Sequence, residues 1–303
     1  MDTWLAIGNA SAGTSDEETI AQVLTCLREF ARVDYVATEG PEDLARELAD
    51  HDDAGLVAVL GGDGSLHAVV QALYDADRLD RTVVGLVPLG TGNDFARTLE
   101  LPDDPVGSAR ALAEGTDRAI DLIVDGDDHV VVNAAHLGLG AQAAERSAPV
   151  KPVLGPLAYA AGAVSTLFSR TPRLRVRIDD RELGGRIAQV AVGNGRFVGG
   201  GGELLPHALV DDGLMDVAVV FASTVPRRIA YALHLSRGTH ADEDYVEYTT
   251  ARRVRVDSAP LGCTSDGELT GPSAVHSWRI VPGALTMRLP VTPAGGSQPT
   301  SAS

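Results

Sequence analysis

Two glycine-rich turns carry the polar residues that could do chemistry in the first third of the chain. The first reads Gly-Gly-Asp-Gly-Ser over residues 61–65, and the second reads Gly-Thr-Gly-Asn-Asp over residues 90–94. Glycines let a backbone approach a ligand closely, and a helix N-terminus after such a turn presents unpaired N–H groups to an anion. Asp63 inside the first turn would repel a phosphate unless a cation lay between them. The two turns therefore predict a site for a nucleotide with Mg²⁺.

Two acidic stretches in the second half of the chain are further candidates. Asp211, Asp212 and Asp216 fall within six positions, so they could hold a hard cation such as Mg²⁺ or Ca²⁺, although Asp-Asp-Gly is also a common hairpin turn. Asp266 and Glu268 lie two positions apart and would point to the same side of an extended segment. Such a pair suits a base that takes a proton from an alcohol near neutral pH, although an isolated Asp-Gly turn would be unremarkable.

Short apolar runs precede the two glycine-rich turns and must position them. Residues 56–60 and 83–87 are continuous apolar segments typical of buried parallel strands, and the helix after the first turn is predicted over Leu66 to Tyr74. Open α/β sheets bind their ligands at the carboxyl ends of such strands. The alternation of strands and helices from Trp4 to Arg97 predicts a parallel, doubly wound sheet.

The residues of the two turns also limit which nucleotide motif is present. Asn93 and Asp94 open a predicted helix, where they would serve as caps whether or not a ligand binds. A Walker P-loop requires Gly-Lys followed by Ser or Thr, but the single lysine of the chain, Lys151, is far from both turns. The dinucleotide pattern G-x-G-x-x-G with an acidic residue about 20 positions on is also missing, which disfavours a dinucleotide oxidoreductase.

The texture of the sequence changes near Ile120. Downstream of it, valine-rich alternation with Asp and Gly turns predicts an antiparallel β domain, interrupted by helices over 157–168 and 225–235. The tail over 293–303 is rich in Pro, Gly, Ser and Thr and is predicted to be disordered. The strands predicted in this part are 120–124, 130–133, 174–178, 187–192, 217–221 and 246–256.

Composition excludes several classes of function. The 303 residues suffice for two domains, and 25 basic against 42 acidic side chains give a net charge of -17, which argues against nucleic-acid binding. Cys26 and Cys263 form neither a metal-ligand cluster nor a disulfide framework, so a reducing cytoplasm is expected. The first residues lack a basic n-region and lead directly into a predicted strand, so no secretory signal is expected, and no apolar run reaches the roughly 18 residues of a transmembrane segment.

One segment departs from the acidic average. From Arg146 to Arg177 there are six basic residues and no Asp or Glu, around the apolar stretch 154–168. Arg173, Arg175 and Arg177 alternate and would share one face of a strand. Two interpretations stay open: a footprint for anionic lipid, or a solvated arginine face over a core helix.

Taken together, these stretches resemble the diacylglycerol kinase catalytic family, specifically the soluble bacterial lipid kinases that are also similar to sphingosine kinases. They occur in the order of the family and span roughly Trp4 to Pro290. The residues that carry the resemblance are 61–67, 88–96, Gly193 and Asn194 with 199–201, 206–216 and 266–268.

The resemblance implies a fold of class α/β plus all-β. An α/β nucleotide-binding domain over 1–120 would be similar to NAD kinases and phosphofructokinases, and a C-terminal β-sandwich over 121–282 would hold the lipid substrate. Residues 283–292 would pack back on the first domain, and the site would lie in the cleft between the two.

The resemblance also implies roles for individual residues. Asp266 would be the general base with Glu268 beside it, and Asp63 would meet the Mg²⁺ of the nucleotide. Asp212 and the carbonyls of His207 and Leu214 would form a second, structural Mg²⁺ site. The implied ATP contacts are Asn9, Thr38, Gly61, Gly62, Asp63, Gly64, Ser65, Leu66, His67, Thr91, Gly92 and Asn93.

One turn departs from the family pattern. The family commonly has Asn-Pro-x-Ser-Gly followed by a basic residue, whereas residues 9–14 here read Asn-Ala-Ser-Ala-Gly-Thr. Proline would fix that turn and the basic group would help with phosphate charge, so whether ATP binding is weaker is left open.

The function predicted from these observations is transfer of the γ-phosphoryl group of ATP, with Mg²⁺, to a lipid hydroxyl of diacylglycerol-like or sphingoid-like type, in line and with Asp266 as the base. The alternatives are a kinase of a soluble alcohol or of NAD on the same fold, and a catalytically weak regulatory homologue that binds lipid. The predicted location is the cytoplasm, peripheral at the inner face of the membrane. Which lipid is used and whether the protein forms a homodimer stay open.

Overall fold

The structure is a computed structural model that describes residues 3–10, 14–138 and 171–291. The predicted helix over 157–168, most of the basic segment from Arg146 and the predicted disordered tail lie outside the described residues. Among the helices within these ranges, none is long and apolar enough to cross a bilayer.

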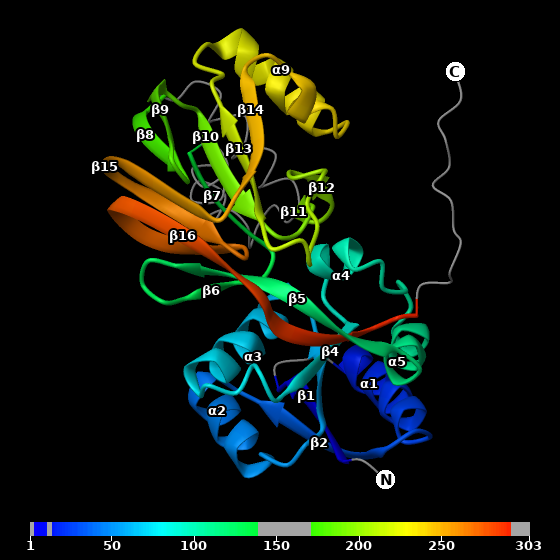
Figure 1. The fold of residues 1–303 in the computed structure, drawn as a ribbon. Coiled ribbons are helices and arrows are strands. Elements are labelled where there is room, and N and C mark those ends of the chain that lie inside the picture. Colours follow the sequence, from blue (N-terminus) through cyan, green and yellow to red (C-terminus); the bar gives the residue numbers. More distant parts are fainter. Residues whose placement is uncertain (1–2, 11–13, 139–170, 292–303) are drawn as a thin grey trace.

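The first part of the chain forms a parallel sheet with helices on both faces (Figure 1). The strands run in the order β4, β3, β1, β2, and every neighbouring pair is parallel. The predicted doubly wound α/β sheet is therefore confirmed. Its elements are β1 (Thr3–Asn9), α1 (Thr14–Leu27), β2 (Arg32–Thr38), α2 (Pro41–Asp50), β3 (Leu56–Gly61), α3 (Asp63–Asp75), β4 (Val83–Pro88), α4 (Asp94–Thr98) and α5 (Pro105–Ala113).

The two faces of this sheet bury alternate residues of each strand against different helices. Leu5 and Ile7 of β1 pack with α2 and α3, whereas Trp4 and Ala6 pack with α1 and α5. Figure 1 shows these two pairs of helices on opposite sides of the sheet. Burial on both faces explains why the strands read as continuous apolar runs and not as alternating ones.

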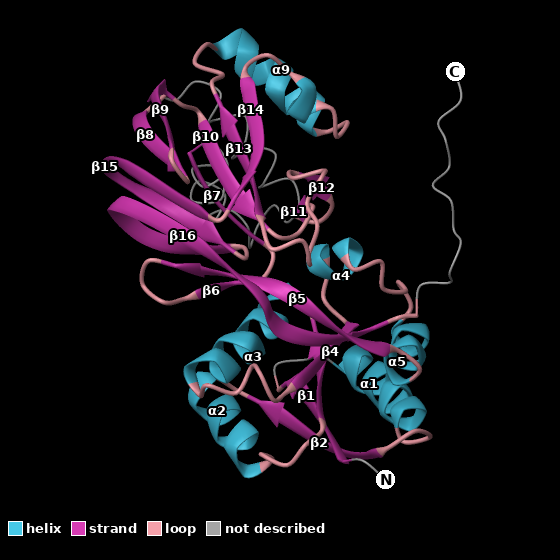
Figure 2. Ribbon diagram, viewed as in Figure 1, coloured by secondary structure: helices cyan, strands magenta, loops and turns pink. Residues whose placement is uncertain are grey.

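The second part of the chain is mostly antiparallel β-structure, with α9 at its outer end (Figure 2). Strands β14, β13, β10 and β7 follow one another and continue into β15 and β16, while β8 and β9 extend β15. A shared apolar core that includes Leu137, Val217 and Trp278 lies between them. The elements are β5 (Thr116–Asp125), β6 (Val130–Val131), β7 (Ala134–Gly138), β8 (Arg173–Ile178), β9 (Arg181–Arg186), β10 (Gln189–Gly193), β11 (Phe197–Val198), β12 (Gly202–Glu203), β13 (Met215–Val220), α9 (Val225–Leu235), a 3-10 turn (His240–Asp242), β14 (Val246–Ala251), β15 (Arg253–Ser265) and β16 (Glu268–Leu289).

Strands β5 and β16 connect the two parts. The 22 residues of β16 pair first with β15, then antiparallel with β5, and finally parallel with β4 through Thr286 and Met287. The predicted boundary near residue 120 falls inside β5, which pairs with β16 at both ends. How the chain divides into domains stays a prediction.

Two predicted elements differ from the structure. Helix α3 begins at Asp63 and not at Leu66, because an acidic residue in the first turn is favoured by the helix dipole and the two turn-forming residues after it are tolerated there. The predicted strand over 246–256 is two strands, β14 and β15, with different neighbours. The break falls at Arg252, whose backbone N–H and that of Arg253 are bonded to the carboxylate of Asp179.

Candidate active site

The two glycine-rich turns lie side by side because β3 and β4 are neighbours in register. Gly61 pairs with Pro88, and the N–H of Leu89 donates to the carbonyl of Gly61 at 3.0 Å. A Cβ added to Gly90 would lie 2.7 Å from the Cα of Gly62, so the close approach of the turns requires glycine at this point. The N-terminus of α3 opens directly from this pair of turns.

Asp63, the first residue of α3, joins the first turn to the helix that follows the second. Its Oδ2 accepts the N–H of Asp94 and its Oδ1 accepts that of Phe95, both at 2.9 Å. Asn93 occupies the N-cap position of α4 without capping it, because its backbone is left-handed with φ 50° and its amide donates to Gly90 instead. The prediction that Asn93 and Asp94 cap their own helix is therefore wrong, since Asp63 supplies that cap.

The donor chemistry at Asp63 fits the Mg²⁺ of a nucleotide. Burial raises the pKa of Asp63, the two N–H contacts lower it, and the charges of Asp94 and Asp266 raise it, with a net upward shift. A dication would offset this negative charge. Within the described ranges, no three His, Cys, Asp or Glu side chains are arranged to hold a metal, so an ion here would take most ligands from phosphates and water.

Asp94 connects the second turn to the glycine run between β11 and β12. It is 6% exposed, and its carboxylate accepts the N–H of Gly200 at 2.9 Å and that of Gly201 at 2.7 Å, as well as a contact from Arg97 at 3.0 Å. Both glycines have positive φ, +86° and +111°, which other residues rarely adopt. Sequence reasoning missed this role, since a helix-opening Asp gives no sign of a partner more than 100 residues away.

The Asp266 carboxylate, in the turn between β15 and β16, reaches back to the first part of the chain. Its side chain is 2% exposed and accepts four hydrogen bonds. Three come from backbone N–H groups, those of Val132 (2.8 Å), Asn133 (2.9 Å) and Ala134 (3.1 Å). The fourth comes from Nδ1 of His67 on α3 at 2.8 Å. A carboxylate only accepts, so Nδ1 of His67 carries the proton.

Glu268 does not lie beside Asp266 in the way that the spacing predicts. Asp266 has φ 45° and Gly267 has φ 87°, so this dipeptide is a tight hairpin turn and not an extended segment. The side chain of Asp266 is buried, while Glu268 is exposed at the start of β16. The prediction that both carboxylates point to one side of a strand is wrong, although both charges act on the same histidine.

His67 has an upward-shifted pKa. Burial lowers the pKa of its imidazole, but the hydrogen bond that the ring donates to Asp266 and the charges of Asp266 and Glu268 outweigh it. The imidazolium form is therefore favoured relative to an ordinary histidine.

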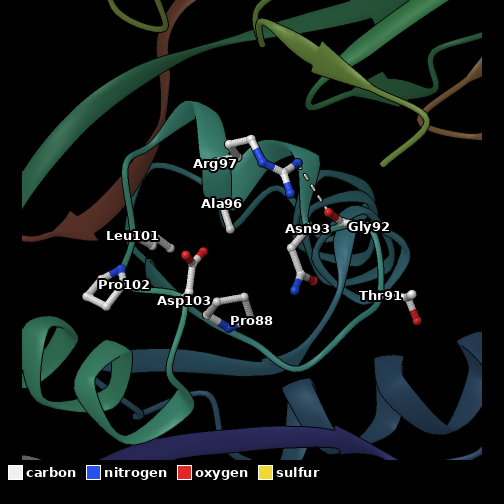
Figure 3. Close-up of a pocket in the computed structure, with 9 residues that line it drawn as sticks. All are labelled: Pro88, Thr91, Gly92, Asn93, Ala96, Arg97, Leu101, Pro102 and Asp103. Carbon is white, nitrogen blue, oxygen red and sulfur yellow. Dashed lines mark hydrogen bonds between the residues drawn. The ribbon is translucent and has the colours of Figure 1, made fainter. Parts of the chain in front are cut away.

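The remaining predicted nucleotide contacts lie along the same edge of the sheet. Asn9 and Thr38 are register partners at the ends of β1 and β2, and the Thr38 hydroxyl donates to the carbonyl of Gly8 at 3.4 Å. Thr91, Gly92 and Asn93 line a cavity of about 70 Å³ (Figure 3). Figure 3 shows Asn93 and Asp103 on opposite sides of it. Asp103 was not among the residues singled out in the sequence.

The predicted structural Mg²⁺ site lies elsewhere, in the loop before β13. Asp211 points away from it, toward Arg118 at 2.6 Å. Oδ1 of Asp212 accepts the N–H of Leu214 at 3.0 Å, and the loop is also held by Asp121, which accepts the N–H of Gly213 at 2.6 Å.

Asp216, at the start of β13, is a second carboxylate close to the predicted Mg²⁺ loop. Asp216 is 2% exposed and accepts the Tyr248 hydroxyl at 2.8 Å. Burial raises the pKa of Asp216 to about 6, against the lowering effect of Tyr248 and together with the raising effect of Asp212. The oxygen donors here suit Mg²⁺.

The described part of the basic segment is a charged strand face. On β8, Arg173, Arg175 and Arg177 are exposed and the residues between them are buried, as predicted. Arg175 and Arg177 both pair with Glu182 of β9, at 3.4 and 3.5 Å. The arginine face is therefore partly neutralised within the protein.

Comparison with known proteins covers both parts of the chain. Residues 3–124 match the family model described as the diacylglycerol kinase catalytic domain, and residues 133–289 match that described as the YegS C-terminal NAD kinase beta sandwich-like domain. The chain belongs to the YegS-like diacylglycerol kinase family. The resemblance predicted from its motifs is thus confirmed.

Relatives and a solved structure align with nearly the whole length of this chain. Proteins called "Probable lipid kinase YegS-like" from Chromohalobacter salexigens and Xanthomonas campestris pv. campestris are each 33% identical, covering 95% of this chain and 93% and 96% of their own. A crystal structure of a diacylglycerol kinase from Bacillus anthracis superposes with a TM-score of 0.79 at 21% identity, covering 97% of this chain and 98% of that one. The predicted α/β plus β-sandwich class is confirmed.

Proposed function

We propose that the protein is a lipid kinase that transfers the γ-phosphoryl group of ATP to a lipid hydroxyl. The observation that carries this proposal is the contact between Asp266 and His67. It joins the acidic hairpin of the second part to α3, whose N-terminus opens from the glycine-rich turns. A base for the acceptor hydroxyl and a cradle for phosphate would thus meet at one place.

The nucleotide would bind along the edge of the parallel sheet where the two turns lie. Backbone N–H groups of the turns and of the α3 N-terminus would face the phosphates, with Asn9 and Thr38 at the adjacent strand ends. Asp63 would hold Mg²⁺, which would neutralise charge on the transferred group. These donors are fixed before substrate binds, so little reorganisation is needed during transfer.

On the acceptor side, the general base would be Asp266, with Glu268 at the mouth of the same hairpin. The hydroxyl oxygen would attack the γ-phosphorus in line with the departing ADP. A diacylglycerol-like lipid is the acceptor that the name of the Bacillus anthracis structure suggests, and a sphingoid-like lipid is the other acceptor that the sequence resemblance implies. The exposed arginines of β8 would assist contact with an anionic membrane surface. The ion pairs of Arg175 and Arg177 with Glu182 would weaken this attraction.

The decisive experiment is transfer of labelled γ-phosphate from ATP to an extracted lipid pool. We expect a labelled lipid that appears only with Mg²⁺. Absence of labelled lipid at every Mg²⁺ concentration, in a preparation that binds ATP, would contradict the lipid-kinase proposal. Label in a water-soluble product instead would favour a kinase of a soluble alcohol or of NAD.

We also propose that Asp212 and the carbonyls of His207 and Leu214 hold a second Mg²⁺. The nearby negative charges of Asp212 and Asp216 support it. Without nucleotide, Mg²⁺ should raise the melting temperature of the wild type and of Asp211→Asn, since Asp211 is paired with Arg118. Asp212→Asn should lose that increase. An equal increase in both variants would remove the second site.

A further inference from the structure

The Asp266 carboxylate has no vacant position for a substrate hydroxyl. Oδ2 accepts from His67 and Val132, and Oδ1 accepts from Asn133 and Ala134. The side chain is 2% exposed. Three of the four donors are the backbone N–H groups of the consecutive residues 132–134, which lead into β7, so a hydroxyl could reach this carboxylate only by displacing His67.

His67 is placed where the hydroxyl proton could be received without such a displacement. Its side chain is 22% exposed, and its Nδ1 is engaged with Asp266. Nε2, on the other side of the ring, is bonded by no residue in the described part of the chain. With the proton held on Nδ1 by Asp266, Nε2 of the neutral ring is an acceptor.

The position of His67 along α3 also suits this task. It lies four residues after Asp63, so both side chains are on one face of the helix, about 6 Å apart along its axis. Asp63 is at the helix N-terminus, next to both glycine-rich turns where phosphates would bind. A histidine one turn further along faces the acceptor side of the same site, where the Asp266 hairpin meets α3.

We propose that Nε2 of His67 takes the proton from the acceptor hydroxyl, and that Asp266 is a positioning residue that acts through the imidazole ring. This inference rests on the proposed kinase function and revises one step of it. The O–H bond breaks, and the proton goes to Nε2. The oxygen forms a bond to the γ-phosphorus of ATP as the bond to the β-phosphate oxygen breaks and ADP leaves. The imidazolium then returns its proton to solvent.

The charges around His67 are consistent with this role. Asp266 and Glu268 face the His67 ring from the hairpin, and Asp63 lies on the same helix as His67. Among the described residues, the charges that shift the pKa of His67 are all negative. An orienting carboxylate on Nδ1 stabilises the imidazolium that forms as the proton arrives at Nε2. His67 would thus be the base that contacts the substrate, and Asp266 would orient its ring and stabilise its charged form.

The first test is His67→Asn, because the Asn amide can still donate toward Asp266 but offers no basic nitrogen. We expect kcat to fall by about 10²- to 10⁴-fold with KM for ATP within about twofold of wild type. In the wild type, kcat should rise with pH through the pKa of His67, and this dependence should disappear in the variant. His129→Asn, at an exposed histidine on the β5–β6 turn, is the matched control and should keep wild-type kcat. Wild-type kcat and pH profile in His67→Asn would overturn the proposal.

The second test does not depend on activity, so it separates this inference from the kinase proposal. Nitrogen-15 and carbon-13 NMR of the histidine rings in the intact protein should show His67 protonated on Nδ1 when neutral. Its pKa should lie above the ordinary value and should fall in Asp266→Asn. A neutral ring protonated on Nε2, or a pKa unaffected by Asp266→Asn, would overturn the relay even if lipid phosphorylation is observed. Failure of phosphoryl transfer with the expected NMR result would instead count against the kinase function alone.

Discussion

Asp63 and Asp266 lie in similar sequences, an acidic residue next to glycine in a short turn, yet they bind different parts of the molecule. The donors to Asp63 are 31 and 32 residues away, in the neighbouring turn of the same sheet. The three backbone donors to Asp266 are 132 to 134 residues away in the chain, and its fourth donor, His67, is 199 residues away. One carboxylate organises a helix within a single layer, while the other fastens two halves of the protein.

This difference separates two kinds of consequence. Changing Asp63 should affect nucleotide binding and the start of α4, because its partners belong to the phosphate cradle. Changing Asp266 should affect the chemical step and the contact between the two parts together, because its partners include both His67 and β7.

Asp266→Asn should produce the largest effect. The amide cannot accept from all four donors and no longer holds the histidine ring, so kcat should fall by about 10²- to 10⁴-fold. The urea concentration at the midpoint of unfolding should fall as well, because buried N–H groups lose their partner. Asp257→Asn, on β15, the strand that leads into the Asp266 turn, is the control and should retain activity, because Asp257 is paired with Arg255. If Asp266→Asn were active and fully stable, Asp266 would have no role in the chemical step or in the contact between the two parts of the chain.

Asp63→Ala should weaken binding of the magnesium nucleotide by tenfold or more, that is by about 1.4 kcal/mol. It should also cost about 1 kcal/mol of folding stability, since α4 loses its N-terminal cap. Calorimetric titration with ATP at several Mg²⁺ concentrations measures the first effect, and urea unfolding the second. Unchanged nucleotide affinity at low Mg²⁺ would leave Asp63 with the capping role alone.

Asp94→Asn should lower stability by about 1 kcal/mol, because the amide oxygen can replace only one of the two contacts to Gly200 and Gly201. Urea unfolding measures the loss, and hydrogen exchange at the two glycine amides locates it. Faster exchange confined to α4, with Gly200 and Gly201 unchanged, would show that Asp94 does not hold the glycine run.

The smallest effect expected is on the pH dependence of stability. Because the pKa of His67 is raised in the folded state, its contribution is full below its unfolded pKa and is lost as pH rises through the folded value. Asp63 also has a raised pKa, so its contribution likewise falls with rising pH, but in a more acidic window. In plots of the free energy of unfolding against pH, His67→Asn should lose the slope in the less acidic window and Asp63→Ala the slope in the more acidic one. If each variant lost the slope in the same pH window, the two groups would titrate together.

Much of the fold and half of the site follow from local patterns in the sequence. The apolar runs before residues 61 and 90 predict neighbouring parallel strands, and their glycines predict the phosphate cradle. The long-range hydrogen bonds of Asp266 could not be predicted in this way. Nothing near Asp266 marks Val132, Asn133 or Ala134 as donors, because any backbone N–H can serve and only the packing of β7 against the hairpin selects these three.

The role of His67 was hidden for a related reason. The resemblance placed His67 among the ATP contacts, and nothing near it in the sequence indicates that its ring is bonded to Asp266, 199 residues away. The resemblance to a kinase family identified Asp266 as important but did not say what occupies its oxygens. Long-range pairing therefore supplies what motif spacing cannot.

The long strand β16 limits how the halves of this protein can move. It passes from the Asp266 hairpin into the parallel sheet, with β5 alongside, and the two keep register except between Val281 and Leu285. A nucleotide that draws the halves together therefore cannot swing them about a slack linker. Any motion of one part relative to the other would have to twist this two-stranded ribbon, whose only irregularity along its described pairing lies around Gly283, where the N–H is bonded to the Asp121 carboxylate.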